Sequence, residues 1–68
     1  MTAVRSSSLA AVGHNALTQT LQVRFRNGGI YQYYSVPRRL YTGLMGAASK
    51  GGFFRRHILN HYSDRKLS

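Results

Sequence analysis

Paired arginines and closely spaced tyrosines are the residues of this sequence whose types could bind a ligand. Guanidinium groups form paired hydrogen bonds with phosphate or carboxylate oxygens, and aromatic rings stack on nucleobases. The residues concerned are Arg24 and Arg26, Arg38 and Arg39, Arg55 and Arg56, and the tyrosines Tyr31, Tyr33 and Tyr34. The chemistry that they could perform is therefore the recognition of an anionic partner.

The charge balance favours the same chemistry. Ten lysine and arginine residues stand against one acidic residue, Asp64, in a chain of 68 residues with a net charge of +9. An anionic partner would relieve the resulting self-repulsion. Nucleic acid is the first candidate partner, an acidic protein surface is the second, and we expect no membrane partner. A basic surface that is merely solvated is the alternative without a ligand.

The residue types offer little to catalysis or to metal binding. One carboxylate side chain cannot supply the paired acids of general acid–base catalysis, and no nucleophile motif surrounds any serine. His57 and His61 have the spacing of a zinc-binding pair on a helix, but the chain lacks cysteine and glutamate. We therefore predict no enzyme, no catalytic residues, no metal site and no cofactor.

Two segments have the composition of an anion site. Arg38 and Arg39 follow Val36-Pro37 in the first turn of a predicted helix, where backbone N–H groups are free. Further along the chain, two glycines are surrounded by Lys50, Arg55 and Arg56 and could turn their N–H groups toward an oxyanion. Solvated arginines and a plain turn between helices are the simpler interpretations of these segments.

A third candidate surface lies on the predicted sheet. Arg24 and Arg26 would share its outer face with Tyr34, whose ring could stack on a splayed base. Together with the two anion segments, the predicted nucleic-acid-binding residues are Arg24, Arg26, Tyr34, Arg38, Arg39, Lys50, Arg55 and Arg56. We favour RNA or another single strand over sequence-specific recognition of duplex DNA. The rival hypothesis is an adaptor that binds an acidic protein.

A β-hairpin positions the tyrosines. Residues 20–26 alternate between apolar and polar, and residues 30–36 form the partner strand. A two-residue loop would mix the core and solvent faces, so we predict the three-residue loop 27–29, with Gly29 in the left-handed conformation. This register places Tyr31 opposite Phe25 and Tyr33 opposite Val23, and it predicts that both tyrosines lie in the core.

The other elements complete an α+β fold. Residues 9–13 are a weak strand and residues 14–19 are a turn. Leu40, Tyr41, Leu44, Met45 and Ala48 form the apolar stripe of a first helix, and residues 53–62 form a second helix after the break at 49–52, where Ser49 is a possible cap. We predict a three-stranded antiparallel meander followed by two α-helices packed on one face of the sheet.

The order of these residues is similar to that of the KTSC domain family. The matching positions are Ser7-Ser8 and Gly13, Leu21, Val23 and Phe25, Asn27-Gly28, Tyr31-x-Tyr33, Val36-Pro37, Tyr41, Leu44, Ala48-Ser49-x-Gly51, Phe54, Ile58 and Tyr62. Family members often have an aromatic residue after the first glycine, where this chain has His14. The resemblance implies the same meander with two helices, and it implies no catalytic residues.

The resemblance also suggests a setting for the domain. Members occur alone in small bacterial and phage proteins and at the C-terminus of some lysyl-tRNA synthetases, which suggests RNA binding by association. We expect a flexible N-terminus over residues 1–7, a single KTSC-like domain over 8–62 and a basic tail over 63–68. The lack of cysteine and of a visible targeting segment fits a cytoplasmic protein, and we favour a monomer.

Overall fold

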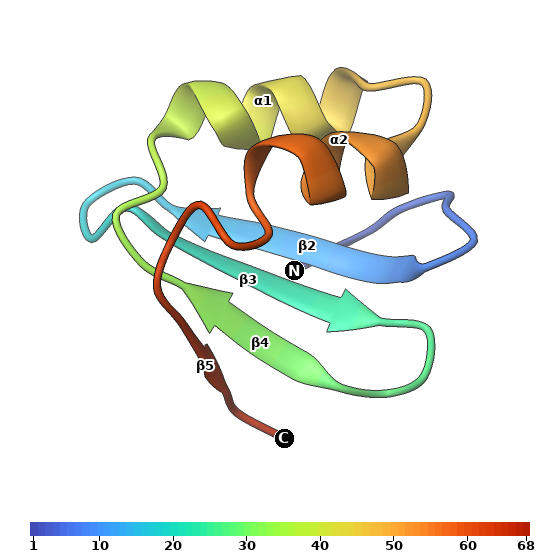
Figure 1. Ribbon diagram of the computed structural model, residues 1–68, viewed down its shortest axis with the longest axis horizontal. Helices are drawn as coiled ribbons and strands as arrows, with labels where there is room; N and C mark the ends of the chain where they lie inside the picture. Colours follow the sequence, from blue (N-terminus) through green and yellow to red (C-terminus); the bar gives the residue numbers. More distant parts are fainter.

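Apolar residues that alternate along the chain build an antiparallel sheet, and two amphipathic helices cover one of its faces (Figure 1). The computed structural model describes residues 1–68. The strands are β1 (Thr2–Ala3), β2 (Leu9–Asn15), β3 (Thr20–Phe25), β4 (Ile30–Tyr33) and β5 (Asp64–Lys66), in this order across the sheet. The helices are α1 (Arg38–Gly46) and α2 (Lys50–His57).

The sheet has five strands, so the predicted number of three strands was wrong. β1 pairs with β2, and β5 pairs with β4, so segments that the sequence placed in a flexible N-terminus and a basic tail form the edges of the sheet. Both strands are two or three residues long and exposed, and backbone hydrogen bonds hold them. Such short polar edges carry no alternation of side chains that a sequence pattern could detect.

The register of the central hairpin differs from the predicted one by two residues. Tyr31 lies opposite Val23, and Tyr33 lies opposite Leu21. The loop comprises residues 26–28, closed by a hydrogen bond from the Phe25 N–H to the Gly29 carbonyl oxygen (2.8 Å), and Gly28 rather than Gly29 has a positive φ, 98°. A shift of two residues leaves every side chain on its predicted face, so alternation could not distinguish the two registers.

The helices begin and end at residues other than the predicted ones. α1 begins directly after Pro37, and it ends at Gly46, which leaves Ala48 exposed outside the helix. Ser49 caps α2 as predicted, because its Oγ accepts a hydrogen bond from the Gly52 N–H (3.2 Å). α2 therefore includes both glycines of the predicted break.

The second helix also ends five residues earlier than predicted. It ends at His57, and Asn60 adopts a left-handed φ of 65° in the turn that follows. Ile58 stays fully buried in that turn. Because Ile58 is a core residue, the helical spacing of apolar residues in the sequence extends past the last residue of α2.

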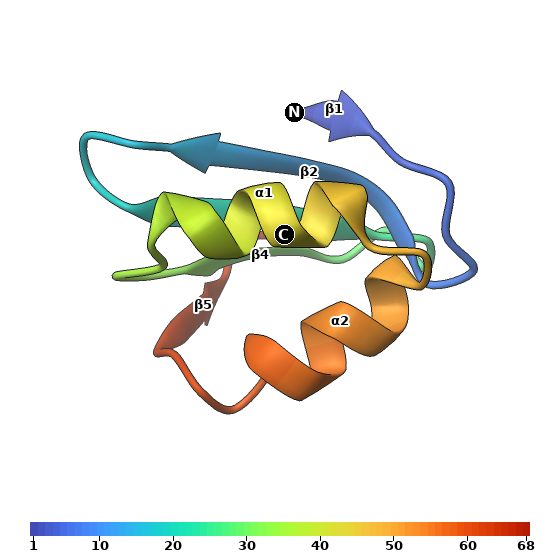
Figure 2. The same ribbon diagram turned by 90° about the horizontal axis from the view of Figure 1, so that it is seen from above.

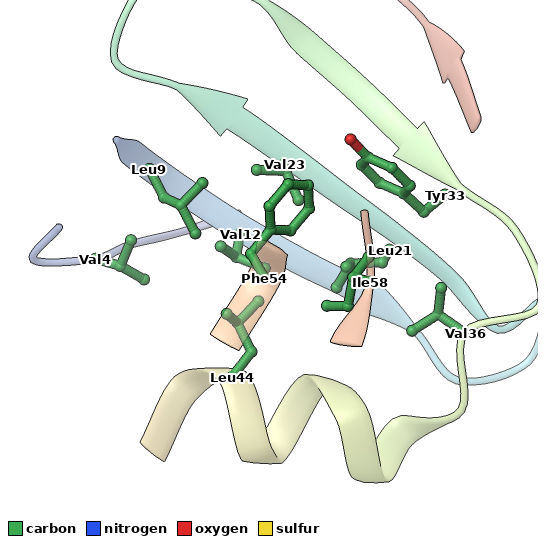
Figure 3. Close-up of a cluster of buried hydrophobic side chains, with 10 residues drawn as sticks. All are labelled: Val4, Leu9, Val12, Leu21, Val23, Tyr33, Val36, Leu44, Phe54 and Ile58. Carbon is green, nitrogen blue, oxygen red and sulfur yellow. The ribbon is translucent and has the colours of Figure 1, made fainter. Parts of the chain in front are cut away.

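The core lies between the sheet and the helices (Figure 3). Each covering element inserts apolar side chains into it: Leu44 comes from α1, Phe54 from α2 and Val36 from the segment before α1. The complete set is Val4, Leu9, Val12, Leu21, Val23, Tyr33, Val36, Leu44, Phe54 and Ile58. Burying a side chain of this kind contributes about 1.5–3 kcal/mol, so this layer holds the domain together.

A histidine supports the junction between the sheet and α1. The ring of His14 stacks on Tyr41 with centroids 5.4 Å apart, and its Nε2 lies 2.8 Å from the Val36 carbonyl oxygen. His14 therefore links β2 to α1 and to the segment that precedes it.

Seen from above, α1 runs along the strands, whereas α2 diverges from it toward the side of β5 (Figure 2). Neither helix is long and apolar enough to cross a bilayer.

Candidate functional site

Four aromatic rings gather between α2 and the strands β3 and β4. Phe25 lies on β3, Tyr31 and Tyr33 lie on β4, and Phe54 comes from α2. Phe25 meets Tyr31 and Phe54 edge-on, each with centroids 5.5 Å apart. Phe54 in turn meets the ring of Tyr33 edge-on at 5.4 Å. These edge-to-face contacts stabilise the cluster beyond the burial of its surface.

The cluster has a buried base and an accessible rim. Tyr33 and Phe54 are 1% and 4% exposed, whereas Phe25 and Tyr31 are half-buried. The prediction that both tyrosines are core residues is thus confirmed for Tyr33 and holds in part for Tyr31. Tyr31 is half-buried and lines the rim, so part of its side chain remains accessible.

The rim surrounds a hollow of about 380 Å³, which we call the aromatic hollow. Six hydrophobic residues make its walls, and polar residues make up the remainder of its lining. The lining residues are Ser8, Leu9, Phe25, Asn27, Tyr31, Tyr33, Gly51, Phe54, Arg55, Leu59 and Asp64. Apolar walls with a few polar groups are typical of ligand sites.

A second hollow lies next to it, at the start of α2. This serine hollow has a volume of about 220 Å³ and shares Ser8, Gly51 and Arg55 with the aromatic hollow. Its lining contains three cations and a run of hydroxyl groups: Arg5, Ser6, Ser7, Ser8, Ala48, Ser49, Lys50, Gly51 and Arg55. The serine hollow therefore provides positive charge and hydrogen-bond donors, the groups that bind phosphate oxygens.

Local hydrogen bonds shape the serine hollow. The Ser6 Oγ accepts hydrogen bonds from the N–H groups of Ser8 and Leu9, both at 3.2 Å. Gly51 packs so closely against this turn that a Cβ atom there would lie 2.6 Å from the Ser8 Oγ. A side chain at position 51 would therefore displace the Ser8 hydroxyl, which supports close packing, the simpler of the two interpretations of this segment. Lys50 donates from Nζ to the Ala47 carbonyl oxygen (3.2 Å) at the end of α1.

A third hollow lies on the opposite side of the aromatic one. This loop hollow, of about 420 Å³, shares Asn27 and Tyr31 with the aromatic hollow and is also lined by Lys66 of β5. The serine and loop hollows have no lining residue in common. The three hollows thus form a row, with aromatic rings in the middle and cations toward both ends.

Burial and charge affect one ionisable group of this row. Burial, followed by the negative charge of Asp64 and the neighbouring Tyr31, raises the pKa of Tyr33 to about 12. The Tyr33 hydroxyl therefore remains protonated at neutral pH. Asp64, which lies opposite Tyr33 at the start of β5, is the one acid of the chain.

The structure divides the predicted nucleic-acid-binding residues between the two layers. Arg24 pairs with Ile30 on the face of the sheet that the helices leave open, because its neighbour Val23 points into the core. Arg38 and Arg39 are exposed at the start of α1, in the other layer. The predicted cations therefore do not form one continuous face.

Some of the predicted residues do meet. Lys50 and Arg55 together line the serine hollow, and Arg55 also lines the aromatic hollow. Arg56 lines a different hollow, beside Phe53 and His57. Tyr34 is half-buried just beyond β4, and it lines none of the hollows.

Arg26 has an intramolecular partner that the sequence did not suggest. Its Nε donates to the Ser6 carbonyl oxygen (2.9 Å), and one terminal nitrogen donates to the Val4 carbonyl oxygen (3.3 Å). These bonds tie the β3–β4 loop to the segment that lines the serine hollow. The Arg26 guanidinium thus stabilises the fold. It is directed toward the N-terminal segment and does not form a common surface with Arg24 and Tyr34.

The largest hollow lies elsewhere and has a different character. It measures about 490 Å³ and is lined mainly by amides and hydroxyls, among them Gln22 and Gln32. No arginine, lysine, tyrosine or phenylalanine lines it. Gln22 and Gln32 also bond to each other through their side chains (2.9 Å).

Sequence reasoning missed several residues of the row. It did not single out Arg5, Asn27, Asp64 or Lys66, which come together from both ends of the chain and from the hairpin loop. The edge strand β5 brings both Asp64 and Lys66 to the tyrosines of β4, and this strand has no sequence pattern. One signal was available: Asp64 is the single acid in a strongly basic chain.

Comparisons with known proteins identify a family with this fold. A family model described as the KTSC domain matches residues 5–62. The crystal structure of a KTSC domain protein from Yersinia pestis superimposes with a TM-score of 0.94 at 36% identity, and the match covers 97% of this chain and 93% of that one.

Relatives of known sequence are of two sizes. A protein from Tsukamurella paurometabola is 40% identical over 53 residues, which are 78% of this chain and 79% of that protein. A lysine–tRNA ligase from Nostoc sp. is 36% identical over 62 residues, which are 91% of this chain. This chain spans only 11% of the length of that ligase.

Proposed function

The chain belongs to the KTSC domain family, and from that premise we propose that it is a non-catalytic module that binds single-stranded RNA along the row of three hollows. Bases would stack in the aromatic hollow, and phosphates would lie against the cations of the serine and loop hollows. The observation that carries this proposal is the order of the row, in which Tyr31 stands between Arg5, Lys50 and Arg55 on one side and Lys66 on the other.

The order of groups suits a single strand better than a duplex. Unpaired bases have free faces that stack on aromatic side chains, whereas the bases of a duplex stack on each other. Successive phosphates of a single strand lie on either side of a stacked base, and the row has cations in both directions. Three of the relatives are lysine–tRNA ligases, whose name states a tRNA substrate, and this favours RNA.

The charge of the chain supports the same partner. With a net charge of +9, the domain attracts a polyanion from a distance and repels other basic molecules. Binding should release counterions, so the affinity depends on salt. If the four cations that line the row each neutralise one phosphate, log affinity should fall against log salt concentration with a slope of roughly −3.

The experiment that tests this function is a fluorescence anisotropy titration with a labelled oligouridine over a series of salt concentrations. We expect saturable binding with the stated slope, and weaker binding of a duplex of the same length. An affinity that does not depend on salt, or equal affinity for the duplex, contradicts the proposal.

The second candidate is an adaptor that binds an acidic protein. The observation that favours it is the presence of exposed arginines in both layers, since Arg24 lies on the open face while Arg38 and Arg39 lie on α1. A pull-down from a bacterial lysate, with and without nuclease, distinguishes the candidates. RNA binding predicts that nuclease removes the captured material, and an adaptor predicts that one polypeptide is retained.

A further inference from the structure

The one acid of the chain lies in the wall of the aromatic hollow. Asp64 lines this hollow at the start of β5, directly opposite Tyr33. A carboxylate repels phosphate, so this position is unsuited to the backbone of a nucleic acid. The other cations of the row, Arg5, Lys50 and Lys66, lie in the neighbouring hollows, and Arg55 lies where the aromatic and serine hollows meet, so phosphates have other places to bind. Asp64 is left to contact what enters the aromatic hollow.

The Asp64 carboxylate has no partner within the chain. Its oxygens take part in none of the side-chain hydrogen bonds, and no ion pair forms between it and any of the ten basic residues. Asp64 is exposed, so its carboxylate is accessible from solvent and no cation of the chain occupies it. Both oxygens are available to accept hydrogen bonds.

We infer that the aromatic hollow binds a guanine base, with the N1–H and N2–H groups of the base donating to the two oxygens of Asp64. This inference rests on the proposed function and names the base that the site selects. The rings of Phe25 and Tyr31 would cover the base, since both are half-buried at the rim of the hollow. Asp64 is then a residue that determines specificity.

The pattern of donors on the bases selects guanine. Guanine presents two neighbouring N–H donors on its Watson–Crick edge, which match the paired acceptors of a carboxylate. Adenine and cytosine each present an amino group beside a ring nitrogen that is an acceptor, and this nitrogen would face a carboxylate oxygen. Uracil presents one N–H between two carbonyl groups. Guanine is therefore the base that can satisfy both oxygens of Asp64.

A cationic ligand is the competing occupant of such a site. Aromatic rings beside a carboxylate also suit a guanidinium or an ammonium group. The net charge of +9 opposes this occupant, because the whole domain repels a cation before it reaches the hollow. The observations therefore favour a neutral base that carries its own negative backbone.

The test uses the full chain and short oligouridines that differ only in their central nucleotide. The centre is guanosine, inosine, adenosine, cytidine or uridine, and affinity is measured by anisotropy at one salt concentration. We expect the guanosine probe to bind about 5- to 100-fold more tightly than the others. Inosine lacks the N2 amino group and should lose most of this preference.

The matched variants are Asp64→Asn and Ser63→Asn. Asp64→Asn is isosteric but replaces one acceptor with a donor, so it should remove the guanosine preference while binding of the all-uridine probe persists. Ser63→Asn places the same amide one residue earlier and should keep the preference. Thermal unfolding of both variants establishes that they are folded.

Each failure has a distinct meaning. If no probe binds, the proposed RNA-binding function is wrong, and so is this inference. If every probe binds equally, or if Asp64→Asn keeps the guanosine preference, RNA binding stands and the inference is overturned. Displacement of the guanosine probe by a short arginine peptide, without any preference among the probes, also overturns it in favour of a cationic ligand.

Discussion

Arg26 is bound to Ser6, because its Nε donates a hydrogen bond to the Ser6 carbonyl oxygen over 2.9 Å. A second bond from the same guanidinium reaches the Val4 carbonyl oxygen, and the Val4 side chain is 8% exposed in the core. The arginine therefore fastens the N-terminal segment to the β3–β4 loop. This relationship gives Arg26 a role that differs from that of every other arginine that we predicted to bind phosphate.

The first prediction concerns this clamp. Arg26→Gln should lower the free energy of unfolding by about 1 kcal/mol, because both main-chain acceptors lose a charged donor at a partly exposed site. Chemical denaturation measures this loss. Arg24→Gln is the matched control, since Arg24 is exposed and makes no hydrogen bond, and it should change stability by less than about 0.5 kcal/mol. Equal losses in the two variants would show that the clamp adds nothing.

The second prediction concerns two glycines in helices. Gly51→Ala should destabilise the domain by about 1–3 kcal/mol, because the new Cβ would lie 2.6 Å from the Ser8 Oγ. Ser8→Ala removes this oxygen and should restore part of the loss. Gly46→Ala should be neutral or should stabilise by up to about 1 kcal/mol, because no atom lies within 4 Å of its Cβ position. The measurement is the denaturation midpoint of the wild type, Gly51→Ala, Gly51→Ala with Ser8→Ala, and Gly46→Ala. A neutral Gly51→Ala would contradict the packing argument.

The third prediction concerns alkaline pH. The pKa of Tyr33 is raised from 10.0 to about 12 in the folded state, so the unfolded chain releases the proton first as pH rises. The stabilisation is complete below pH 10 and is lost between about pH 10 and pH 12, at a slope of at most ~1.4 kcal/mol per pH unit for one proton.

The comparison that isolates this proton is with Tyr33→Phe. The variant keeps the ring and cannot ionise at this position, and both proteins share the titration of their lysines and other tyrosines. The difference between their unfolding free energies, followed from pH 8 upward by denaturation, should therefore change only in the window that Tyr33 sets. If the unfolding free energies of the wild type and Tyr33→Phe stay parallel from about pH 10 to pH 12, the prediction is wrong.

The fourth prediction separates two neighbouring tyrosines. Tyr31→Ala removes a ring from the wall of the aromatic hollow and should weaken oligouridine binding by about 1–3 kcal/mol if bases stack there. Tyr34→Ala removes a ring of similar exposure that lines no hollow, and it should leave affinity almost unchanged. Anisotropy titrations at constant salt measure both. A larger loss of affinity in Tyr34→Ala than in Tyr31→Ala would indicate that RNA binds the open face of the sheet.

The fifth prediction concerns two arginines in opposite layers. Arg55 lines the serine and aromatic hollows, so Arg55→Gln should reduce the magnitude of the salt slope by about 0.7, the value for one phosphate of a single strand. Arg24→Gln should leave the slope unchanged, because Arg24 lies on the open face away from the row. A slope that responds equally to both changes would indicate diffuse attraction to the whole surface.

Side-chain alternation and helical spacing predict those parts of this fold that depend on neighbours along the chain. They place the strands of the hairpin and the buried positions Leu21, Val23 and Tyr33, and Ser49 signals the start of α2 through its own hydroxyl. They do not detect β1 and β5, because backbone hydrogen bonds alone hold these polar edges. They also leave the hairpin register open to a shift of two residues, since such a shift preserves every face.

Residue types and their spacing predict a sheet with buried aromatic residues, two covering helices and a charge that suits an anionic partner. These properties follow from composition and from periodic patterns, which are local. Which cations share a surface depends on the folded arrangement. Arg24 and Arg55 lie in different layers, whereas Arg5 from one end of the chain and Asp64 and Lys66 from the other meet at the same row of hollows. Strand order and helix packing decide which residues become neighbours across the sheet. The spacing of residues along the chain does not reveal either of them.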